Sequence, residues 1–490
     1  MSKDADKPRY SPFRNWISLI GLVIMIGSLF SFILLFAIDT FAHSSSPYLG
    51  ILTFVVAPCF LTAGMALMVL GWLVYKRKVE KNAGLTAPSF NIDLSRAADR
   101  RNFTIFAVGA MVFILFAALG SYHTYHFAES VMFCGQTCHT PMGPEYTTYC
   151  NSPHANVSCT ACHVGPGAVS FVKAKLNGVH QLKDTILNTF ERPVKAPRSM
   201  RPARETCGEC HWPKKYYGDV ERTVTRFLSD EKNTRYTCQM LVKVGGGDPT
   251  HGPVGGIHWH MNMASKVEYL STNEDRQSIP WVRLTDAAGK VTEFRSSNFT
   301  NDIAQYPIRT MDCLDCHNRP AHQYRNPGEA ADLELSLGKI DPSLLSIKKN
   351  LVTFISKTNT TKAEGMEFIA ASLRKTYPKE NKIETLIAEA QTIYSNNVFP
   401  EMKSDWRTHP DNIGHKNWPG CFRCHDGKHK TADGKRKIEA SNCNDCHVII
   451  AQGDGDELKK LDPKGLPFAH PGGPGGTDPD CASCHPDVVN

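Results

Sequence analysis

The segment Cys159-Thr-Ala-Cys162-His163 sets a pattern that recurs five more times further along the chain. The chain has 490 residues, with 17 cysteines and 20 histidines, and only one cysteine (Cys59) lies before residue 121. This usage differs from that of an ordinary cytosolic enzyme, where cysteines are few unless they hold a metal or act in catalysis. The other copies of the pattern span Cys207–His211, Cys313–His317, Cys421–His425, Cys443–His447 and Cys481–His485.

The spacing within each copy suits covalent attachment of haem. Two thiols three residues apart can bond to the two vinyl groups of one haem, and the adjacent imidazole then meets the iron from the same side. Zinc sites and redox dithiols also use Cys-x-x-Cys pairs, but neither needs a His after every one of six copies. The predicted thioether cysteines are Cys159, Cys162, Cys207, Cys210, Cys313, Cys316, Cys421, Cys424, Cys443, Cys446, Cys481 and Cys484, and the predicted proximal ligands are His163, His211, His317, His425, His447 and His485.

A seventh site is predicted at a stretched copy, in which three residues separate Cys134 from Cys138 and His139 follows. Free thiols or a disulfide are the alternative reading of this pair. Seven covalently bound haem c groups are therefore expected, and the motifs are numbered along the chain from the stretched copy (first) to Cys481–His485 (seventh). Of the remaining cysteines, Cys59 is interpreted as a small core residue, and a disulfide between Cys150 and Cys238 stays open.

Each haem iron has a second axial position, and thirteen histidines outside the motifs are available to fill it. Two imidazoles on one iron leave no open position, which favours electron transfer over substrate binding. Met142, shortly after His139, is a candidate ligand of the first haem or a packing residue. The candidate distal histidines are His154, His180, His258, His260, His322, His415, His429 and His470.

The first part of the chain is predicted to span a membrane. Three uncharged apolar runs lie at about residues 16–38, 49–75 and 103–120. At 1.5 Å per residue each is long enough to cross a hydrocarbon core of about 30 Å, and in lipid only a helix satisfies its own backbone at this length. Buried core helices are the alternative, but uncharged runs of this length argue against them.

Lysine and arginine predict the orientation of these spans. Basic residues precede the first run and fill the segment between the second and third runs, whereas the segment between the first and second has none. A multi-pass protein of the bacterial cytoplasmic (inner) membrane is expected, with a cytoplasmic N-terminus and a periplasmic haem domain. The first run could also be a signal peptide, but it is long for one and has no clear cleavage site.

Residues 100–215 or so resemble the NapC/NirT/NrfH family of membrane quinol dehydrogenases. The likeness rests on a membrane anchor followed by Phe133-Cys134 with Cys138-His139 and Met142, and then by His154-Ala-Asn before the Cys159 motif. Three spans and seven haem sites most resemble the inner-membrane heptahaem quinol-oxidising cytochromes of metal-reducing bacteria. The resemblance implies that menaquinol binds beside the first haem and that periplasmic c-type cytochromes receive the electrons.

The same resemblance suggests a quinol site after the second motif, where the family has a lysine and an acidic residue. Lys173 or Lys175 matches the lysine, and Asp184 the carboxylate, although His180 is nearer the usual interval. An amphipathic helix with a solvated basic face also fits this segment. In the family the methionine is the second residue after the motif His; here Met142 is the third, so the ligand of the first haem stays open.

The expected fold is a membrane-anchored multihaem cytochrome with three transmembrane helices and a mainly helical, loop-rich haem domain. A hairpin is expected within residues 279–297, and helices are expected at 326–400, which contain no Cys or His and carry apolar residues at helical spacing. The predicted parts are a membrane domain at 1–120, a module with haems 1–3 at 121–225, an insertion with haem 4 at 226–325, a helical spacer at 326–400 and a module with haems 5–7 at 401–490.

Together these features predict a menaquinol dehydrogenase of anaerobic respiration. The alternatives are a terminal reductase of a small oxyanion, which needs an open iron, and a relay subunit without its own quinol site. The formal charge is +7, but residues 1–120 account for +5 of it. In that part of the chain the basic residues indicate the orientation of the membrane spans. Haem propionates would make the rest acidic, so nucleic acid is not an expected partner. The sequence leaves the oligomeric state open.

Overall fold

The protein is represented by a computed structural model. It describes residues 15–41, 56–81, 94–97, 100–101, 103–105, 107–109, 111–112, 115, 127, 130–137, 139–164, 178, 181, 183–195, 202–211, 218–246, 255–261, 265–440, 442–471 and 481. The chain forms two compact units. The first holds residues 1–138, 158–189 and 197–201, and the second holds residues 139–157, 190–196 and 202–490.

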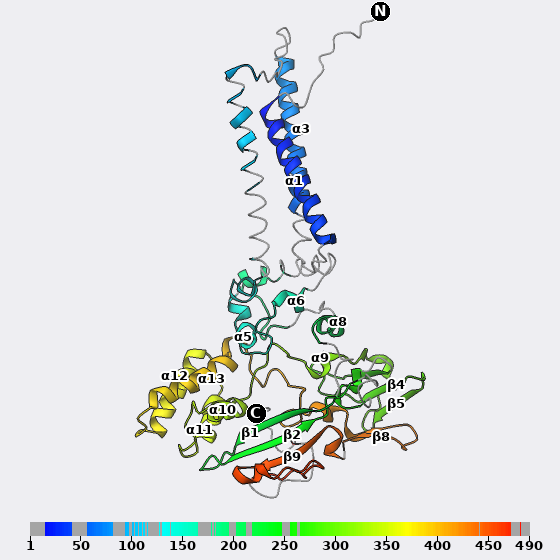
Figure 1. The fold of residues 1–490 in the computed structure, drawn as a ribbon, viewed down its shortest axis with the longest axis vertical. Coiled ribbons are helices and arrows are strands. Elements are labelled where there is room, and N and C mark those ends of the chain that lie inside the picture. Colours follow the sequence, from blue (N-terminus) through cyan, green and yellow to red (C-terminus); the bar gives the residue numbers. More distant parts are fainter. Residues whose placement is uncertain are drawn as a thin grey trace, which may run out of the picture. The chain divides into compact units, whose positions relative to one another are not determined.

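Two long apolar helices, α1 (Trp16–Phe41) and α3 (Ala57–Lys81), lie in the first unit (Figure 1). Both are long and apolar enough to cross a membrane, over Trp16–Leu35 and Ala57–Lys78. They correspond to the first two predicted runs; residues 49–55, at the start of the second run, lie outside the described residues. Half of the third run, 103–120, lies outside the described residues.

Helices α1 and α3 approach closely because small residues line their contact. A Cβ atom added to Gly21 would stand 2.7 Å from the carbonyl oxygen of Gly64, and one added to Gly64 would stand 2.8 Å from that of Gly21. The buried Ser18 hydroxyl donates to the Met68 carbonyl (3.3 Å). Small residues and interhelical hydrogen bonds are the usual means by which helices associate in lipid, where the hydrophobic effect contributes nothing between them.

Two antiparallel sheets form much of the second unit. The three-stranded sheet has the order β1-β2-β9 and the six-stranded sheet the order β6-β3-β4-β5-β7-β8. The strands are β1 (Val220–Phe227), β2 (Arg235–Val242), β3 (Lys266–Leu270), β4 (Trp281–Thr285), β5 (Val291–Ser296), β6 (Ile308–Thr310), β7 (Asp426–Lys430), β8 (Lys437–Glu439) and β9 (His447–Gly453).

Both sheets join segments that are distant in sequence. Strand β9 begins at the motif residue His447 and pairs with β2, so that His447 stands opposite Val242. Strand β7 follows the motif residue His425 and pairs with β5, with Lys430 opposite Arg295. Figure 1 shows β1, β2 and β9 side by side. Strands from 226–325 and from 401–490, which were predicted as separate modules, thus pair with each other in both sheets.

The expectation of a mainly helical haem domain needs correction, because the described residues carry nine strands. The expected hairpin is confirmed as β4 and β5, in which Trp281 stands opposite Arg295. Strands β1 and β2 pair across a short connection that the sequence analysis did not predict, whereas the β2–β9 and β5–β7 pairs join segments far apart in the chain. Local apolar periodicity carries little signal for such pairings, because a register is decided by the partner strand and by the buried face.

A helical layer occupies the region predicted as a spacer. It consists of α10 (Pro327–Ser336), α11 (Ile347–Ile355), α12 (Lys362–Thr376) and α13 (Ile383–Asn397), which confirms the helical expectation for residues 326–400. Leu351, Ile369 and Leu373 are fully buried in its core. Thr361 and Glu364 form a capping box that begins α12.

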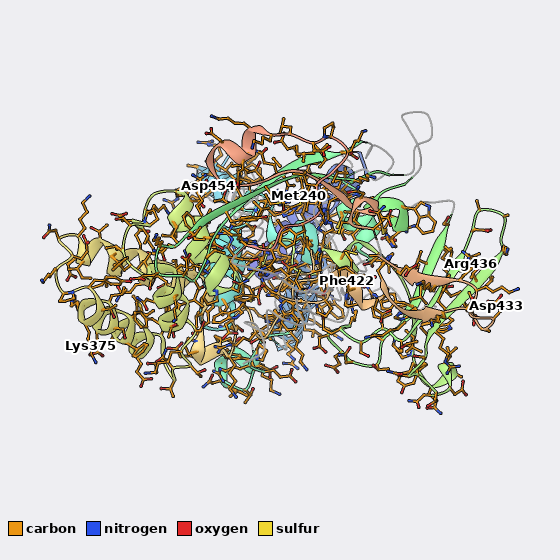
Figure 2. All side chains as sticks on the ribbon, turned by 90° about the horizontal axis from the view of Figure 1, so that it is seen from below. Met240, Lys375, Phe422, Asp433, Arg436 and Asp454 are labelled. Carbon is orange, nitrogen blue, oxygen red and sulfur yellow. The ribbon has the colours of Figure 1, made fainter. Side chains whose placement is uncertain are left out.

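Short helical turns carry most of the described motifs. In the first unit these are the π-helical turn η2 (Phe133–Thr137) and α6 (Cys159–His163). In the second unit they are α8 (Ala203–Cys207), α9 (Cys313–Cys316), η7 (Gly420–Arg423) and η8 (Cys443–Asp445), and the longer helix α5 (His139–Cys150) begins at the His of the stretched motif. Four further turns of this unit carry no motif: η4 (Ile257–Met261), η5 (Ile303–Gln305), η6 (Pro400–Met402) and η9 (Gly455–Lys459). Seen from below in Figure 2, Phe422 of the fifth motif lies between Lys375 on the helical layer and Asp433 near the β7–β8 turn.

Candidate haem-binding site

The motif turns place both thiols and the imidazole on one side of the backbone. In three motifs the N–H of the His donates to the carbonyl of the first Cys, at 2.7 Å for His211, 2.8 Å for His317 and 3.0 Å for His425. This hydrogen bond closes one helical turn, and residues three and four apart lie on the same face of such a turn. The arrangement is the one that covalent haem attachment requires.

The fourth motif is held by a buried carboxylate. Asp315, the residue before Cys316, forms a capping box with Asp312 at the start of α9. Its Oδ1 atom accepts hydrogen bonds from Tyr269 (2.6 Å), Arg276 (2.7 Å) and Arg309 (3.0 Å). These bonds tie the turn to the six-stranded sheet. Sequence reasoning missed Asp315, because a variable position inside the motif carries no pattern.

Thiols of different motifs lie close together. In the first unit the Cys159 thiol is hydrogen-bonded with Cys134, which lowers the pKa of Cys159 to about 7. In the second unit the Cys313 thiol is hydrogen-bonded with Cys207, which lowers the pKa of Cys313 to about 7. The stretched motif is therefore beside the second motif, and the third motif is beside the fourth.

The later motifs continue this series within the second unit. Burial raises the pKa of Cys316 to about 11, and the neighbouring Cys421 raises it further. Burial also raises the pKa of Cys446, again with a contribution from Cys421. The Sγ atom of Cys481 lies 3.6 Å from Nδ1 of His415, whose ring faces His447 of the sixth motif. From the third motif to the seventh, neighbours in sequence are thus neighbours in space.

Four motif histidines each face a second imidazole. Metal–nitrogen bonds of about 2 Å on both sides of one iron place the centroids of two opposed imidazoles about 6 Å apart. All four pairs have this spacing, which leaves room for one iron between the rings. The pairs are His154 with His211 (6.0 Å), His258 with His317 (6.3 Å), His260 with His425 (5.9 Å) and His415 with His447 (6.4 Å).

Backbone carbonyls orient several of the predicted distal histidines. A carbonyl can only accept, so an Nδ1 atom that bonds to it must carry the proton, and a neutral ring then presents the Nε2 lone pair to a metal. Metal-bound histidines use their other nitrogen in this way. The bonds run from His154 to Pro320 (3.1 Å), His258 to Val244 (2.9 Å), His260 to Ile257 (2.8 Å) and His322 to Glu145 (2.9 Å).

Burial and a facing imidazole favour the neutral form, which is the form that binds iron, in two motif histidines. Burial lowers the pKa of His317, and the facing His258 lowers it further. The pKa of His425 falls for the same two reasons, with His260 as the neighbour. Neutral rings keep a lone pair for a metal at physiological pH.

The Glu145 side chain on α5 organises the surroundings of His322. Arg319 donates to both carboxylate oxygens (2.9 and 3.0 Å), and Tyr324 donates to Oε1 (3.2 Å). Burial lowers the pKa of His322. The sequence analysis noted His322 but missed Glu145 and Arg319, since the three come together only in the folded chain.

The prediction that His429 is a haem ligand needs correction. This ring lies on β7, only 2% exposed. Its Nδ1 atom is 2.8 Å from Oδ1 of Asp426, and its Nε2 atom is 2.6 Å from the Ile279 carbonyl. Both nitrogens bond within the protein, so His429 joins β7 to the loop before β4 and has no nitrogen for an iron.

The other predicted site residues lie in different surroundings or outside the described residues. His470 lies beside Phe468, with ring centroids 6.2 Å apart. His163 ends α6, and Met142 is half-buried on α5. Lys173, Lys175, His180, Cys138, Cys484 and His485 are outside the described residues, as is the side chain of His139.

Asp184 lies in a short helical segment of the first unit. Its Oδ1 atom accepts from the Thr189 hydroxyl (3.3 Å). Two large apolar side chains follow it, Ile186 and Leu187, which are 74% and 58% exposed. A carboxylate beside exposed apolar groups is thus present in this segment.

The remaining cysteines are described as free thiols. Cys150 is exposed at the end of α5, whereas Cys238 is buried on β2, so the two form no disulfide. Cys59 is exposed on α3, which corrects its interpretation as a core residue.

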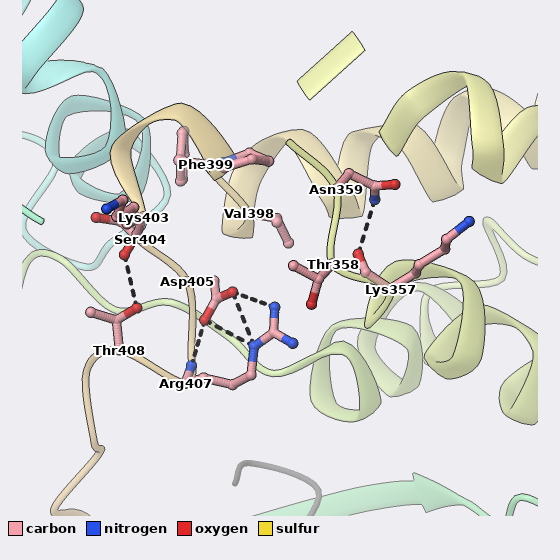
Figure 3. A pocket seen from close by; sticks show the side chains of 11 residues that line it. Lys357, Thr358, Asn359, Val398, Phe399, Lys403, Ser404, Asp405, Arg407 and Thr408 are labelled. Carbon is pink, nitrogen blue, oxygen red and sulfur yellow. Dashed lines mark hydrogen bonds and ion pairs between the residues drawn. The ribbon is translucent and has the colours of Figure 1, made fainter. Parts of the chain in front are cut away.

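The pocket drawn in Figure 3 is separate from the candidate haem ligands. It has a volume of 340 Å³ and is lined by residues of the helical layer and the loop after it, among them Asn359 and Phe399. Asp405 and Arg407 form an ion pair at its wall (2.6 Å). None of the predicted haem-binding residues lines it.

The donor set fits haem c, because pairs of thiols stand beside imidazoles, and four pairs of facing imidazoles have the spacing that one iron requires. These features define a multihaem c-type cytochrome. Residues 97–204 match the NapC/NirT cytochrome c family, N-terminal region. Over 490 aligned residues the chain is 36% identical to the cytochrome c-type protein ImcH of Geobacter sulfurreducens, covering 96% of this chain and 95% of that protein. The chain therefore belongs to the NapC/NirT cytochrome c family. No solved structure matches it significantly.

Proposed function

We propose that the protein is a menaquinol dehydrogenase that passes electrons from the membrane quinol pool, through seven c-type haems, to periplasmic c-type cytochromes in anaerobic respiration. Haem supplies one-electron chemistry when bound. The observation that carries the proposal is the series of neighbouring motifs in which four proximal histidines face a second imidazole. Iron with two imidazoles has no position for a substrate, so this arrangement suits electron transfer better than oxyanion reduction.

The chain contributes attachment, ligation and placement. Paired cysteines hold each cofactor, the motif His supplies one ligand and a second His, fixed through Nδ1, supplies the other. We assign Met142 to the first site, together with His139. The two apolar helices suit a membrane anchor, and we place three spans there, with the N-terminus in the cytoplasm and residues 121–490 in the periplasm.

The quinol is proposed to bind in the segment after the second motif. Quinol oxidation releases two protons, so the site needs acceptors for them. Asp184 is one candidate, because its carboxylate lies beside the exposed Ile186 and Leu187, which suit an apolar isoprenoid tail. Lys173 or Lys175 is proposed to orient the quinol hydroxyl.

The test is quinol-driven reduction of purified full-length protein, with a soluble menaquinol analogue and absorbance at the haem bands. We expect Asp184→Asn and the double variant Lys173→Met/Lys175→Met to slow reduction by about 10²-fold, the size of a typical general-base effect, while dithionite still reduces all haems. Lys195→Met is the matched control, because this lysine is exposed and its ion pairs with Glu191 and Glu274 lie at the surface.

Other outcomes separate the alternatives. Unchanged rates in both test variants would remove the assignment of this segment. Wild-type protein that quinol cannot reduce, although a reduced cytochrome can, would indicate a relay subunit without a quinol site. Turnover of an oxyanion by the reduced protein would indicate a terminal reductase.

A further inference from the structure

The turn η4 carries two histidines that face two different motifs. His258 and His260 are two residues apart on a 3₁₀ turn, which has three residues per turn, so their side chains diverge by about 120°. His258 faces His317 of the fourth motif and His260 faces His425 of the fifth. This turn lies outside residues 97–204, the part that matches the family.

Backbone contacts hold η4 against the end of β2. The N–H groups of Ile257 and His258 donate to the carbonyls of Lys243 (2.8 Å) and Val244 (3.1 Å). The two backbones approach closely at Gly245 and Gly256, which have φ values of +42° and +76°. A Cβ atom at Gly256 would overlap the Lys243 carbonyl, so the glycines make this approach sterically feasible.

The two imidazoles are held by separate carbonyls. Nδ1 of His258 is 2.9 Å from the Val244 carbonyl, and Nδ1 of His260 is 2.8 Å from the Ile257 carbonyl. A metal bond from either ring would therefore come from Nε2. The ring planes of His258 and His317 are nearly parallel (8°), whereas those of His260 and His425 are nearly perpendicular (82°).

We propose that η4 ligates two neighbouring haems at once, with His258 as the distal ligand of the fourth haem and His260 as that of the fifth. Cys316 and Cys421 of the two motifs interact, so the two sites are adjacent. One anchored turn then fixes the relative position of both irons and joins the segment that carries the fourth motif to the segment that carries the fifth. The proposal rests on the proposed electron-transfer function but not on quinol as the donor.

The ring angles make the proposal testable by electron paramagnetic resonance of the oxidised protein. Low-spin ferric haem with parallel imidazole planes gives a rhombic spectrum, and perpendicular planes give a highly anisotropic spectrum with a large maximal g value. In full-length protein we expect His258→Ala to convert one haem of seven to high spin and to reduce the rhombic signal. His260→Ala is expected to convert one haem as well but to reduce the large-g signal. Added imidazole should restore the low-spin state in both.

Trp259→Phe is the matched control, since it changes the residue between the two ligands and should leave the spectrum low-spin. Intact-mass measurement checks that every variant keeps its haems. If an alanine variant loses haem, His258→Met or His260→Met replaces it, with a raised reduction potential of one haem as the expected result. Haem-loaded variants that keep the wild-type spectrum and potentials would overturn the proposal, as would two variants that alter the same signal. Failure of quinol to reduce the protein would leave these spectra unaffected and would count only against the proposed donor.

Discussion

At the residue scale, His409 shows how burial without a facing imidazole changes a histidine. Its ring stacks on Tyr324 with centroids 5.3 Å apart, and its buried Nε2 atom has no hydrogen-bond partner among the described residues. Burial lowers the pKa of His409 to about 4, and Arg319 lowers it further, whereas Glu145 and Asp405 act in the opposite direction. This ring therefore stays neutral in the folded protein.

We expect His409 to make folding stability depend on pH. Its pKa lies below the ordinary value of 6.5, so the unfolded chain binds more protons between pH 6.5 and 4, and stability falls as the pH falls through that range. The expected loss from pH 7 to pH 5 is about 1–2 kcal/mol. Urea unfolding of wild type and His409→Phe at both pH values measures it, and equal pH dependence in the two proteins would contradict the expectation.

At the element scale, a buried ion pair joins α10 to α11. The Lys348 ammonium on α11 contacts the Asp332 carboxylate on α10, and both side chains are at most 6% exposed. Burial lowers the pKa of Lys348 to about 8, although Asp332 opposes the shift. Asp332 also accepts the N–H of Phe227 on β1 (2.9 Å), so the pair links the helical layer to the three-stranded sheet.

Lys348→Met should destabilise the second unit by about 3 kcal/mol, because it removes the closer of the two cations that contact the buried Asp332 carboxylate. The other cation, Arg226, is partly exposed and lies 3.5 Å away. Lys349→Met is the matched control on the same helix, since that lysine is exposed, and it should change stability by less than about 0.5 kcal/mol. Urea midpoints measure both. Adding Asp332→Leu to Lys348→Met should recover part of the loss, and a double variant no more stable than the single one would argue against this account.

The elements also show how far local patterns reach. Helices α11 to α13 and the β4–β5 hairpin follow from periodicity and turn residues within short windows. The β2–β9 and β5–β7 pairings do not, because each partner strand lies far along the chain and the pairing depends on tertiary packing. For this reason the haem domain contains more β-strands than its local sequence patterns indicate.

At the scale of the whole molecule, the number of cofactors is the property to measure. We expect intact-mass spectrometry of the purified protein to show seven covalent haems. Cys134 of the stretched motif is hydrogen-bonded to Cys159 of the second motif, as neighbouring attachment sites would be. The double variant Cys134→Ser/Cys138→Ser should carry one haem fewer, with Cys150→Ser as the matched control because that thiol is exposed and outside the motifs. Six haems in the wild type would contradict haem attachment at the stretched motif.

The sequence alone was enough to place this chain among multihaem c-type cytochromes and to locate two apolar helices that can cross a membrane. Both conclusions depend on local chemistry, since five consecutive residues suffice to attach a haem and a span is a count of apolar residues at 1.5 Å each. The tertiary structure decided which histidines face each other. His154 precedes the second motif but faces His211 of the third, and His415 precedes the fifth but faces His447 of the sixth. Proximity in sequence could not identify these pairs, because the opposite side of a haem is reached by whichever segment the fold brings there. His429, by contrast, lies close to a motif in sequence, but in the folded chain both of its ring nitrogens form hydrogen bonds to other protein groups, so neither nitrogen remains for an iron.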